Sequence, residues 1–458
     1  MAAIRLSGKR RDVDMTQGNI LQHIITFALP LMLGNLFQQL YNMVDTWVLG
    51  NFANNAAYSA VGMITPVCNM LIGFFMGLSA GAGVVISQHY GAGQHDKVQN
   101  AVHTALVMTL GLGVLFTAVG IFMTPYVLQL MNMEADMIKE ATTYLTIYFS
   151  GILGLMLYNI GSGILRAVGD SKRPFYFLVI CAVLNTILDL VFVLVFQMGV
   201  AGVAAATILA QAISALLIII TLLRSDNCIR VSLRKLKIHW DMLRKIFTVG
   251  IPAALQMTIT SFSNVFVQSY IVQFGEACAG GWTTYFKVDQ ILLLPMQSVS
   301  LAATTFVGQN LGKGQTERAR KGVNISLFVA AAATCILMLP VLIFAPQISA
   351  FFNAKPEVVE YASLFMWWLT PFYVLCCINQ ILVGALRGAG NSKAPMIISL
   401  SSFVFFRQVY LYIMANYICN EIVPIAMAYP AGWLLCSTVM FLYYNKVRLG
   451  KTRLVHDT

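Results

Sequence analysis

The chain has 458 residues, of which 58% are apolar and only 10% are charged, and its formal net charge is +11. Soluble globular domains contain about 45–50% apolar and about 25% charged residues, so this composition excludes a soluble protein. The basic excess does not indicate nucleic-acid binding either, because the lysines and arginines gather in alternate loops between apolar segments.

The apolar segments, taken in chain order, predict transmembrane helices. Each is long enough to cross about 30 Å of hydrocarbon, which takes about 20 helical residues. None alternates apolar and polar residues as the strands of a membrane barrel do. Pro30, Pro66, Pro252 and Pro295 lie inside four long segments, where we expect kinks. The sequence predicts an all-α integral membrane protein with twelve spans, near 22–50, 58–87, 99–124, 140–165, 174–197, 200–224, 243–274, 279–309, 321–345, 359–386, 394–419 and 424–446.

The charges in the loops predict the topology. Basic residues concentrate at both ends of the chain and in the even-numbered loops, as Lys9, Arg10, Arg11, Lys172, Arg173, Arg230, Arg234, Lys235, Lys237, Lys313, Arg318, Arg320, Lys321, Lys446, Arg448, Lys451 and Arg453. The intervening loops are mainly acidic, with Glu134, Asp136, Glu140, Glu276, Glu357, Glu360 and Glu421 against Lys139 and Lys355. By the positive-inside rule we expect a multi-pass protein of the plasma (inner) membrane with both termini in the cytoplasm.

Two blocks of sequence recur at one offset. The block Gln88-His-Tyr-Gly-Ala-Gly-Gln94 resembles Gln309-Asn-Leu-Gly-Lys-Gly-Gln315, and 309 − 88 = 221. The block Gly163 to Pro174 resembles Gly384 to Pro395 at the same offset, and Phe27 to Pro30 resembles Phe247 to Pro252 with a small insertion. An offset that contains six spans returns the chain to the same side of the membrane. We therefore predict two parallel six-helix repeats that form two pseudo-symmetric lobes around a central cavity.

The repeat predicts the domain organisation. We expect an N-terminal lobe at 1–237, which ends in a basic cytoplasmic linker, and a C-terminal lobe at 238–458. Two similar lobes that meet at an interface are typical of alternating-access carriers, whose substrate site lies near the midplane. The glycines of the first repeated block, Gly91, Gly93, Gly312 and Gly314, have two interpretations: they turn the chain, or they form a gating contact between the lobes.

Polar side chains at membrane depth are candidates for function, because each ionised group costs about 2.5–3.5 kcal/mol to insert. In the first lobe they fall on three helix faces at i, i+4 or i+7 spacing: Gln38, Asn42 and Asp45; Asn185 and Asp189; Thr207 and Gln211. Two neighbouring carboxylates in a low dielectric favour binding of a proton or Na⁺. The alternative interpretation is that these groups form hydrogen bonds between helices and only hold the lobe together.

The second lobe has its own ionisable residues, Lys287, Asp289 and Arg407. Lys287 and Asp289 do not face each other at i, i+2 on a helix, so we expect structural ion pairing, with Arg407 as the partner of Asp289, or a place in the cavity wall. Aromatic, methionine and amide side chains would give the cavity a deformable wall. The predicted substrate cavity comprises Gln38, Tyr41, Asn42, Tyr158, Asn159, Gln211, Gln256, Met257, Tyr285, Asp289 and Arg407.

The chain resembles the multidrug and toxic compound extrusion (MATE) family, and within it the DinF-like branch. The resemblance runs from about Thr16 to Tyr444 and rests on Phe27-Ala-Leu-Pro30, on Tyr41-Asn-Met-Val-Asp45 and on the paired blocks above. It implies that Asp45, Asn185, Asp189 and Thr207 form a cation-coupling site, whose protonation or Na⁺ binding is coupled to release of the substrate. The chain departs from the NorM-like branch, because Gln256 stands near the place of an acid on the seventh helix and the tenth helix has no acid.

The predicted function is therefore export of amphipathic, mainly cationic, organic compounds in exchange for H⁺ or Na⁺. A lipid or oligosaccharide flippase of the same superfamily is the alternative, although large polyanionic headgroups need several central basic residues. An enzyme is not expected, because no metal-binding cluster, serine elbow or phosphate-binding loop is present in the sequence. We expect no cofactor, no nucleic acid and no obligatory protein partner, and a monomer in the lipid bilayer.

Overall fold

The computed structural model describes residues 13–52, 55–131, 133 and 135–455, and its regular structure is helical. The first half of the chain forms α1 (Ile20–Phe52), α2 (Asn55–Gly91), α3 (His95–Leu130), α4 (Ala135–Ser150), α5 (Ile152–Ala167), α6 (Lys172–Leu190) with the π-helical turn Val191–Val195, and α7 (Gly199–Leu223). The second half forms α8 (Trp240–Val272), α9 (Glu276–Gly312), α10 (Thr316–Ile343), α11 (Ala345–Phe352), α12 (Pro356–Leu369), α13 (Tyr373–Gly388), α14 (Lys393–Leu400), α15 (Arg407–Ile413), α16 (Ile422–Ala426) and α17 (Ala428–Lys446).

The predicted twelve membrane spans are confirmed. Eleven helical segments in the described residues are long and apolar enough to cross a bilayer, and a bent pair supplies the twelfth. In that pair Asp136–Ser150 and Ile152–Ala167 meet at 47°. The bend lies at Gly151, where an added Cβ would stand 1.5 Å from a methyl group of Ile208 on α7. The chain therefore turns where α7 packs directly against the α4–α5 backbone.

The long helices that contain the four prolines are unbroken. Pro30 lies inside the 33-residue α1, Pro66 inside the 37-residue α2, Pro252 inside α8 and Pro295 inside α9. A proline inside a helix removes one backbone hydrogen bond and bends the axis without ending the helix when packing on either side holds it. These four helices extend well beyond the length that a perpendicular span requires.

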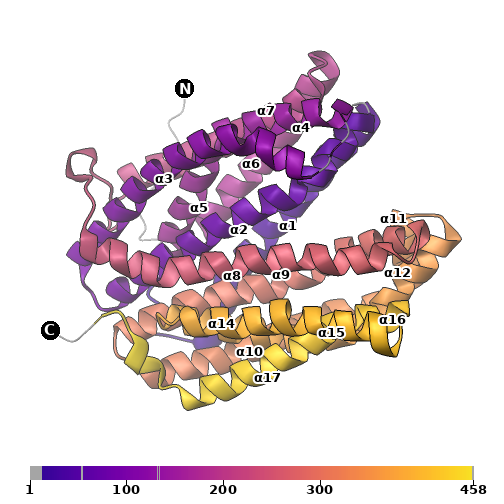
Figure 1. Cartoon of the computed structure of the whole chain (residues 1–458). Coiled ribbons are helices and arrows are strands. Elements are labelled where there is room, and N and C mark those ends of the chain that lie inside the picture. Colours follow the sequence, from indigo (N-terminus) through magenta and orange to yellow (C-terminus); the bar gives the residue numbers. More distant parts are fainter. Residues whose placement is uncertain (1–12, 53–54, 132, 134, 456–458) are drawn as a thin grey trace.

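The helices form two lobes (Figure 1), the first made of α1–α7 and the second of α8–α17. Each lobe has its own apolar core, yet each first helix begins inside the core of the other lobe. Ile24, Phe27 and Leu31 at the start of α1 are buried in the core of the second lobe. Met242 and Ile246 at the start of α8 are buried in the core of the first lobe. The pseudo-symmetric lobes are thus interleaved where their first helices begin.

Along the seam between the lobes, the backbones of α2 and α8 touch. A Cβ on Gly77 would stand 2.3 Å from the Cα atom of Ala254, and one on Gly81 would stand 2.5 Å from the Cα atom of Gly250. Only glycine fits positions where two backbones approach this closely. Glycines therefore set the distance between the lobes along this seam.

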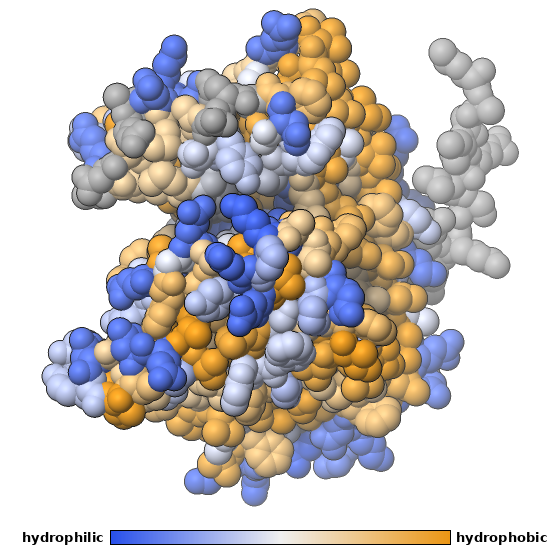
Figure 2. Space-filling model, turned by 90° about the vertical axis from the view of Figure 1, so that its right-hand side faces the viewer, coloured by the Kyte–Doolittle hydropathy of each residue, from blue (hydrophilic) through white to orange (hydrophobic). Residues whose placement is uncertain are grey.

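The lobes converge at the end where α2 runs into α3 and α9 runs into α10, and they diverge at the opposite end (Figure 1). Seen from the divergent end, the surface is hollowed between the upper and the lower lobe, and hydrophilic residues gather around that cleft (Figure 2). We call the two ends of the molecule the converged end and the open end. The central cavity that the repeat predicts is therefore a cleft that faces the open end.

The glycines of the repeated block divide between their two interpretations. Gly93 and Gly314 have positive φ angles of 70° and 79°, so they turn the chain. Gly91 and Gly312 lie where the lobes touch, because an added Cβ would stand 1.9 Å from the carbonyl oxygen of Gln309 and 2.0 Å from that of Gln88, respectively. Of the charges that predict the topology, Lys9, Arg10, Arg11 and Glu134 lie outside the described residues.

Candidate functional site

Two carboxyl groups meet inside the first lobe. Asp45 lies on α1 and Asp189 on α6, and these two helices pack along each other. Gly34 permits this packing, since a Cβ there would stand 3.2 Å from the side chain of Leu178. The side chain of Asp189 is fully buried, Asp45 is half-buried, and the two carboxyls are close enough to interact electrostatically. The structure thus brings together Asp45 and Asp189, the two first-lobe acids that the spacing of polar residues along their helices predicts as candidates.

The polar atoms around this pair lack partners within the protein. Asp45 Oδ1, both carboxyl oxygens of Asp189 and both amide atoms of Asn185 are buried and accept or donate no hydrogen bond. Buried polar groups in proteins almost always have a partner. Two ionised carboxylates are both acceptors and repel each other, so two buried neighbouring acids favour binding a proton or a cation between them. The carboxyl pair, Asp45 and Asp189, is chemically suited to bind one.

Tyrosines enclose the carboxyl pair on one side. Tyr41 is buried and lies within electrostatic range of Asp45, and Gln38, one turn earlier on α1, is half-buried. Tyr144 on α4 lies within range of both carboxyls, and its ring stacks on Tyr148 with centroids 6.1 Å apart. Sequence reasoning missed Tyr144 and Tyr148, although their i, i+4 spacing places them on one helix face. These rings keep the surroundings of the acids largely apolar.

Other predicted first-lobe residues take part in different contacts. The Thr207 hydroxyl donates to the Val203 carbonyl of its own helix, and the Asn159 amide donates to Leu155 in the same way. Tyr158 donates from its hydroxyl to Pro174 and so ties α5 to α6. Asn42 is exposed, and Gln211 is buried with an unpartnered Oε1. The Thr207 hydroxyl therefore donates its proton within its own helix, which leaves its oxygen free to accept.

Asp289 in the second lobe is bound by tyrosine. The Tyr373 hydroxyl donates to Asp289 Oδ1, and its oxygen lies 3.0 Å from the Tyr285 hydroxyl. Gln290 Nε2 donates to the other carboxyl oxygen at 3.3 Å. Unlike the first-lobe acids, this carboxyl has partners for both oxygens. It belongs to a buried chain of hydrogen bonds between α9 and α13.

The predicted ion pair between Asp289 and Arg407 is wrong. Arg407 Nη2 donates instead to Ser263 Oγ at 2.9 Å and to Asn264 Oδ1 at 2.8 Å, and its guanidinium lies 4.7 Å from the centre of the Tyr429 ring. A guanidinium can be buried without a carboxylate when neutral acceptors and an aromatic face replace its water. Two ion pairs join described residues elsewhere in the chain, Arg173–Asp170 and Lys245–Asp241.

Gln256 and Met257 lie on the side of α8 that faces other helices. Gln256 Nε2 donates to Ser399 Oγ at 2.8 Å, and its Oε1 accepts from Arg387 at 3.2 Å. Met257 packs against α2, where a Cβ added to Gly73 would stand 3.4 Å from the Cβ atom of Met257. Sequence reasoning missed Arg387, although it ends the repeated Gly-x-Leu-Arg motif. Gln256 is held by its neighbours, which is a structural role in this conformation.

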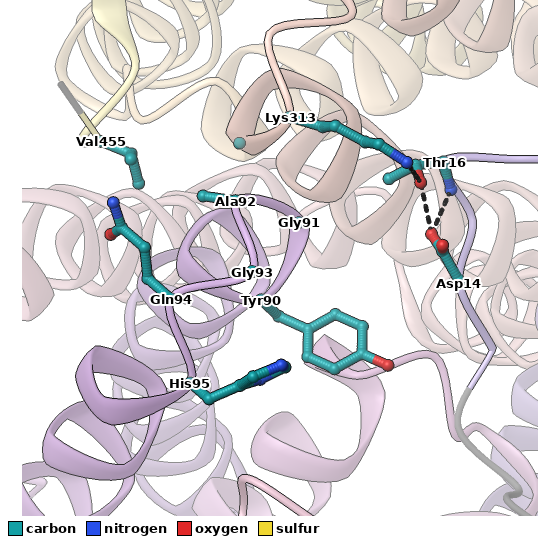
Figure 3. Close-up of a pocket in the computed structure, with 11 residues that line it drawn as sticks. Asp14, Thr16, Tyr90, Gly91, Ala92, Gly93, Gln94, His95, Lys313 and Val455 are labelled. Atoms are coloured by element: carbon teal, nitrogen blue, oxygen red, sulfur yellow. Dashed lines mark hydrogen bonds between the residues drawn. The ribbon is translucent and has the colours of Figure 1, made fainter. Parts of the chain in front are cut away.

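A separate cavity of about 620 Å³ lies at the converged end (Figure 3), well away from the carboxyl pair. It is lined by the turn Tyr90–His95, by Gly312 and Lys313, and by Asp14 and Thr16 of the N-terminal segment. Within the described residues, no group of three or more His, Cys, Asp or Glu side chains gathers to bind a metal. A Na⁺ ion at the carboxyl pair would therefore take further oxygens from Asn185 or from water.

A model of the MatE family matches twice, at residues 30–191 and 252–413. The chain is 30% identical to "Probable multidrug resistance protein YpnP" of Bacillus subtilis over 94% of this chain and 96% of that protein. It is 27% identical to "Probable multidrug resistance protein NorM" of Thermotoga maritima over 93% and 92% of the two chains.

The fold matches solved structures over nearly the whole chain. One of them is described as "Outward-facing conformation of a multidrug resistance MATE family transporter of the MOP superfamily". It superposes with a TM-score of 0.90 over 97% of this chain and 99% of that chain, at 24% identity. The double match of the family model, with starts 252 − 30 = 222 residues apart, agrees with the internal repeat. The boundary at 237/238 and the assignment to the DinF-like branch stay predictions.

Proposed function

The chain belongs to the MATE family of multi-pass membrane transporters, and from this premise we propose that it is a secondary antiporter. It exports amphipathic, mainly cationic, organic compounds across the plasma membrane in exchange for H⁺ or Na⁺. The converged end faces the cytoplasm, in line with the basic residues of the linker and of both terminal segments. The cleft in Figure 2 then faces outward.

The observation that carries this proposal is the carboxyl pair with its unpartnered oxygens. Keeping two acids in the membrane is costly, and neutral side chains would hold α1 against α6 at a lower cost. A site that takes up and releases one ion explains the cost. When an ion enters from the outer side, it lowers the charge of the pair from −2 to −1 and removes the repulsion between α1 and α6 at Asp45 and Asp189. When the ion has left, the two carboxylates repel each other and the helices shift so that water or another cation reaches them.

Ion entry can supply the energy for export. Each elementary charge that moves down the membrane potential releases about 2.3 kcal/mol per 100 mV. The substrate in turn needs only a binding site whose affinity differs between the two states of the carboxyl pair. The tyrosines around the pair transmit that difference, because Tyr41 and Tyr144 are packed within electrostatic range of Asp45 and also form part of the lobe's packing.

Transport by the purified chain in vesicles tests the proposal. A pH gradient and a Na⁺ gradient are imposed separately while a fluorescent cationic substrate is followed. We expect one gradient to drive transport in the parent, and Asp45→Asn and Asp189→Asn each to abolish the gradient-driven part. The matched control is Asp136→Asn, which makes the same change at an exposed carboxylate of the same lobe. Gradient-driven transport that survives in both Asp45→Asn and Asp189→Asn would refute the role of the carboxyl pair.

A further inference from the structure

Two glutamines occupy equivalent positions at the converged end, one at the end of each long interface helix. Gln88 on α2 and Gln309 on α9 are related by the internal repeat, and both are fully buried. Their backbones face the opposite lobe: the Gln309 carbonyl oxygen lies against Gly91, and the Gln88 carbonyl oxygen lies against Gly312. The two helix ends therefore cross with almost no side-chain atoms between them.

The side chains of these glutamines bind the opposite lobe in the same way. Gln88 Nε2 donates to the Gly388 carbonyl at the end of α13, at 2.8 Å. Gln309 Nε2 donates to the Ala167 carbonyl at the end of α5, at 2.9 Å. Ala167 and Gly388 are themselves 221 residues apart, the offset of the repeat. Each glutamine thus satisfies a buried carbonyl at a helix end of the other lobe, a group that has no partner in its own helix.

The carbonyl side of each glutamine binds a terminal segment of the chain. Gln309 Oε1 accepts from the backbone N–H of Met15 at 3.0 Å, and Gln88 Oε1 accepts from the backbone N–H of Leu454 at 2.7 Å. One glutamine amide can donate and accept at once, so each side chain joins three parts of the chain. The N-terminal segment is bound through Gln309 and the C-terminal segment through Gln88.

Further contacts fasten the N-terminal segment across both lobes. The N–H of Val13 donates to the Val168 carbonyl in the first lobe at 3.3 Å. From the second lobe, Lys313 Nζ donates to Thr16 Oγ1 at 2.8 Å, and Arg318 Nη2 donates to the Gly18 carbonyl at 2.9 Å. Figure 3 shows Asp14 and Thr16 beside Lys313, across the cavity from the turn that carries Gln94 and His95. This segment lies over the crossing as a bridge between lobes.

We propose that Gln88 and Gln309, with the segments 13–18 and 452–455, form a glutamine lock that holds the converged end closed. Opening that end breaks four hydrogen bonds of the two buried glutamine side chains, one donated and one accepted by each, and releases both terminal segments. The lock acts on the conformational equilibrium of the lobes. It requires that the lobes part at this end, as the proposed antiport does, but it does not depend on which ion or compound is carried.

The distance between the lobes measures the lock directly. Spin labels are placed at Asp96 and Glu317, which are exposed, lie in the first turns of α3 and α10, and are equivalent by the repeat. Unnatural side chains carry the labels, because the chain has nine cysteines. Distances are recorded by pulsed electron resonance in vesicles without any gradient, so that a loss of ion coupling cannot imitate a loss of the lock.

The variants are Gln88→Leu and Gln309→Leu, singly and together. We expect the double variant to raise the ratio of parted to closed converged ends about tenfold, which corresponds to about 1.4 kcal/mol. The matched control is Gln99→Leu, because Gln99 is a glutamine of the same end whose side chain donates to Arg230 on its own side of the seam. An unchanged distance distribution in the double variant, or an equal change in the control, would overturn the lock.

A second variant keeps the test valid if the leucine variants do not fold. Leu454→Pro removes the N–H that Gln88 accepts while it leaves both glutamines in place. We expect a smaller shift in the same direction. If this variant leaves the closed distance and its population unchanged, the C-terminal segment is not part of the lock.

Discussion

The close approach of Gly91 to α9 predicts a conformational effect for Gly91→Ala. The new Cβ would stand 1.9 Å from the carbonyl oxygen of Gln309 and 2.6 Å and 2.7 Å from its carbonyl carbon and Cα atom. Ordinary contact begins at 3.4 Å, so α2 and α9 must separate by about 3.4 − 1.9 = 1.5 Å. All three atoms belong to the backbone, and no side-chain rotation can relieve the overlap.

The expected cost falls on the closed state alone. Overpacking of a tight interface costs about 1–3 kcal/mol, which changes a two-state ratio about 5- to 150-fold. Once the converged end parts, the added methyl group no longer meets the Gln309 backbone. We therefore expect Gly91→Ala to increase the parted population within that range, as measured by the distance between spin labels at 96 and 317. Gly312→Ala is expected to act in the same direction, since its Cβ would stand 2.0 Å from the Gln88 carbonyl oxygen.

Gly93→Ala is the matched control, two residues further along the same turn. Gly93 has a φ of 70°, and no atom lies within 4 Å of an added Cβ. Alanine there costs about 1–2 kcal/mol of backbone strain without pushing the lobes apart. It should lower the thermal stability and leave the distance distribution unchanged. The reasoning is refuted if Gly91→Ala keeps the closed distribution, or if Gly93→Ala parts the lobes to the same extent.

Three further predictions concern the contacts in the second lobe and the N-terminal segment. Tyr373→Phe removes the hydrogen bond to the Asp289 carboxyl and should lower the free energy of unfolding by about 1–2 kcal/mol, measured by thermal unfolding in detergent. Arg407→Leu loses two hydrogen bonds and a cation–π contact. It should lower the free energy of unfolding by about 3 kcal/mol in the same assay. A loss below about 1 kcal/mol would contradict the contacts described. Partial burial alone would raise the pKa of Asp14, but hydrogen bonds from Thr16 and nearby positive charge outweigh it and lower that pKa below its usual 3.8. The carboxylate therefore stabilises the segment at neutral pH and loses this effect as the pH falls below about 3.8. The protection of the Thr16 amide against exchange, relative to the unfolded rate at the same pH, should fall there in the parent, and Asp14→Asn should show no such pH step.

The fold could be predicted from the sequence because a membrane imposes few solutions. Apolar length fixes the number of spans, and the repeated blocks around Gln88 and Gln309 fix the parallel relation of the lobes. The break at Gly151 could not be predicted in this way. It depends on Ile208 of another helix, which packs against the backbone at that glycine. A contact between distant segments leaves no periodic signal in either of them.

The candidate site was predictable where a single helix face carried the information. Asn185 and Asp189 share a face, and Asp45 opposes them because α1 packs along α6. Thr207 was predicted from its helix face and from the family resemblance, and the structure adds that its hydroxyl donates to the Val203 carbonyl of the same helix. The sequence also could not predict the partner of Asp289, because a charged residue and a tyrosine hydroxyl can each satisfy a buried acid. Such choices depend on side-chain directions that only the packed structure defines.

The direct backbone contact of α2 with α8 restricts how the two lobes can move. At Gly77 and Gly81 the partner atoms are Cα and backbone nitrogen atoms of Ala254 and Gly250. No rotamer can change there to accommodate a translation, so sliding the helices along each other would meet steric resistance at both glycines. Rotation about an axis close to this contact displaces these atoms least. The contact at Gly77 and Gly81 therefore favours rotation of one lobe relative to the other about a nearby axis. A small angle of rotation there moves both ends of the molecule by a larger distance.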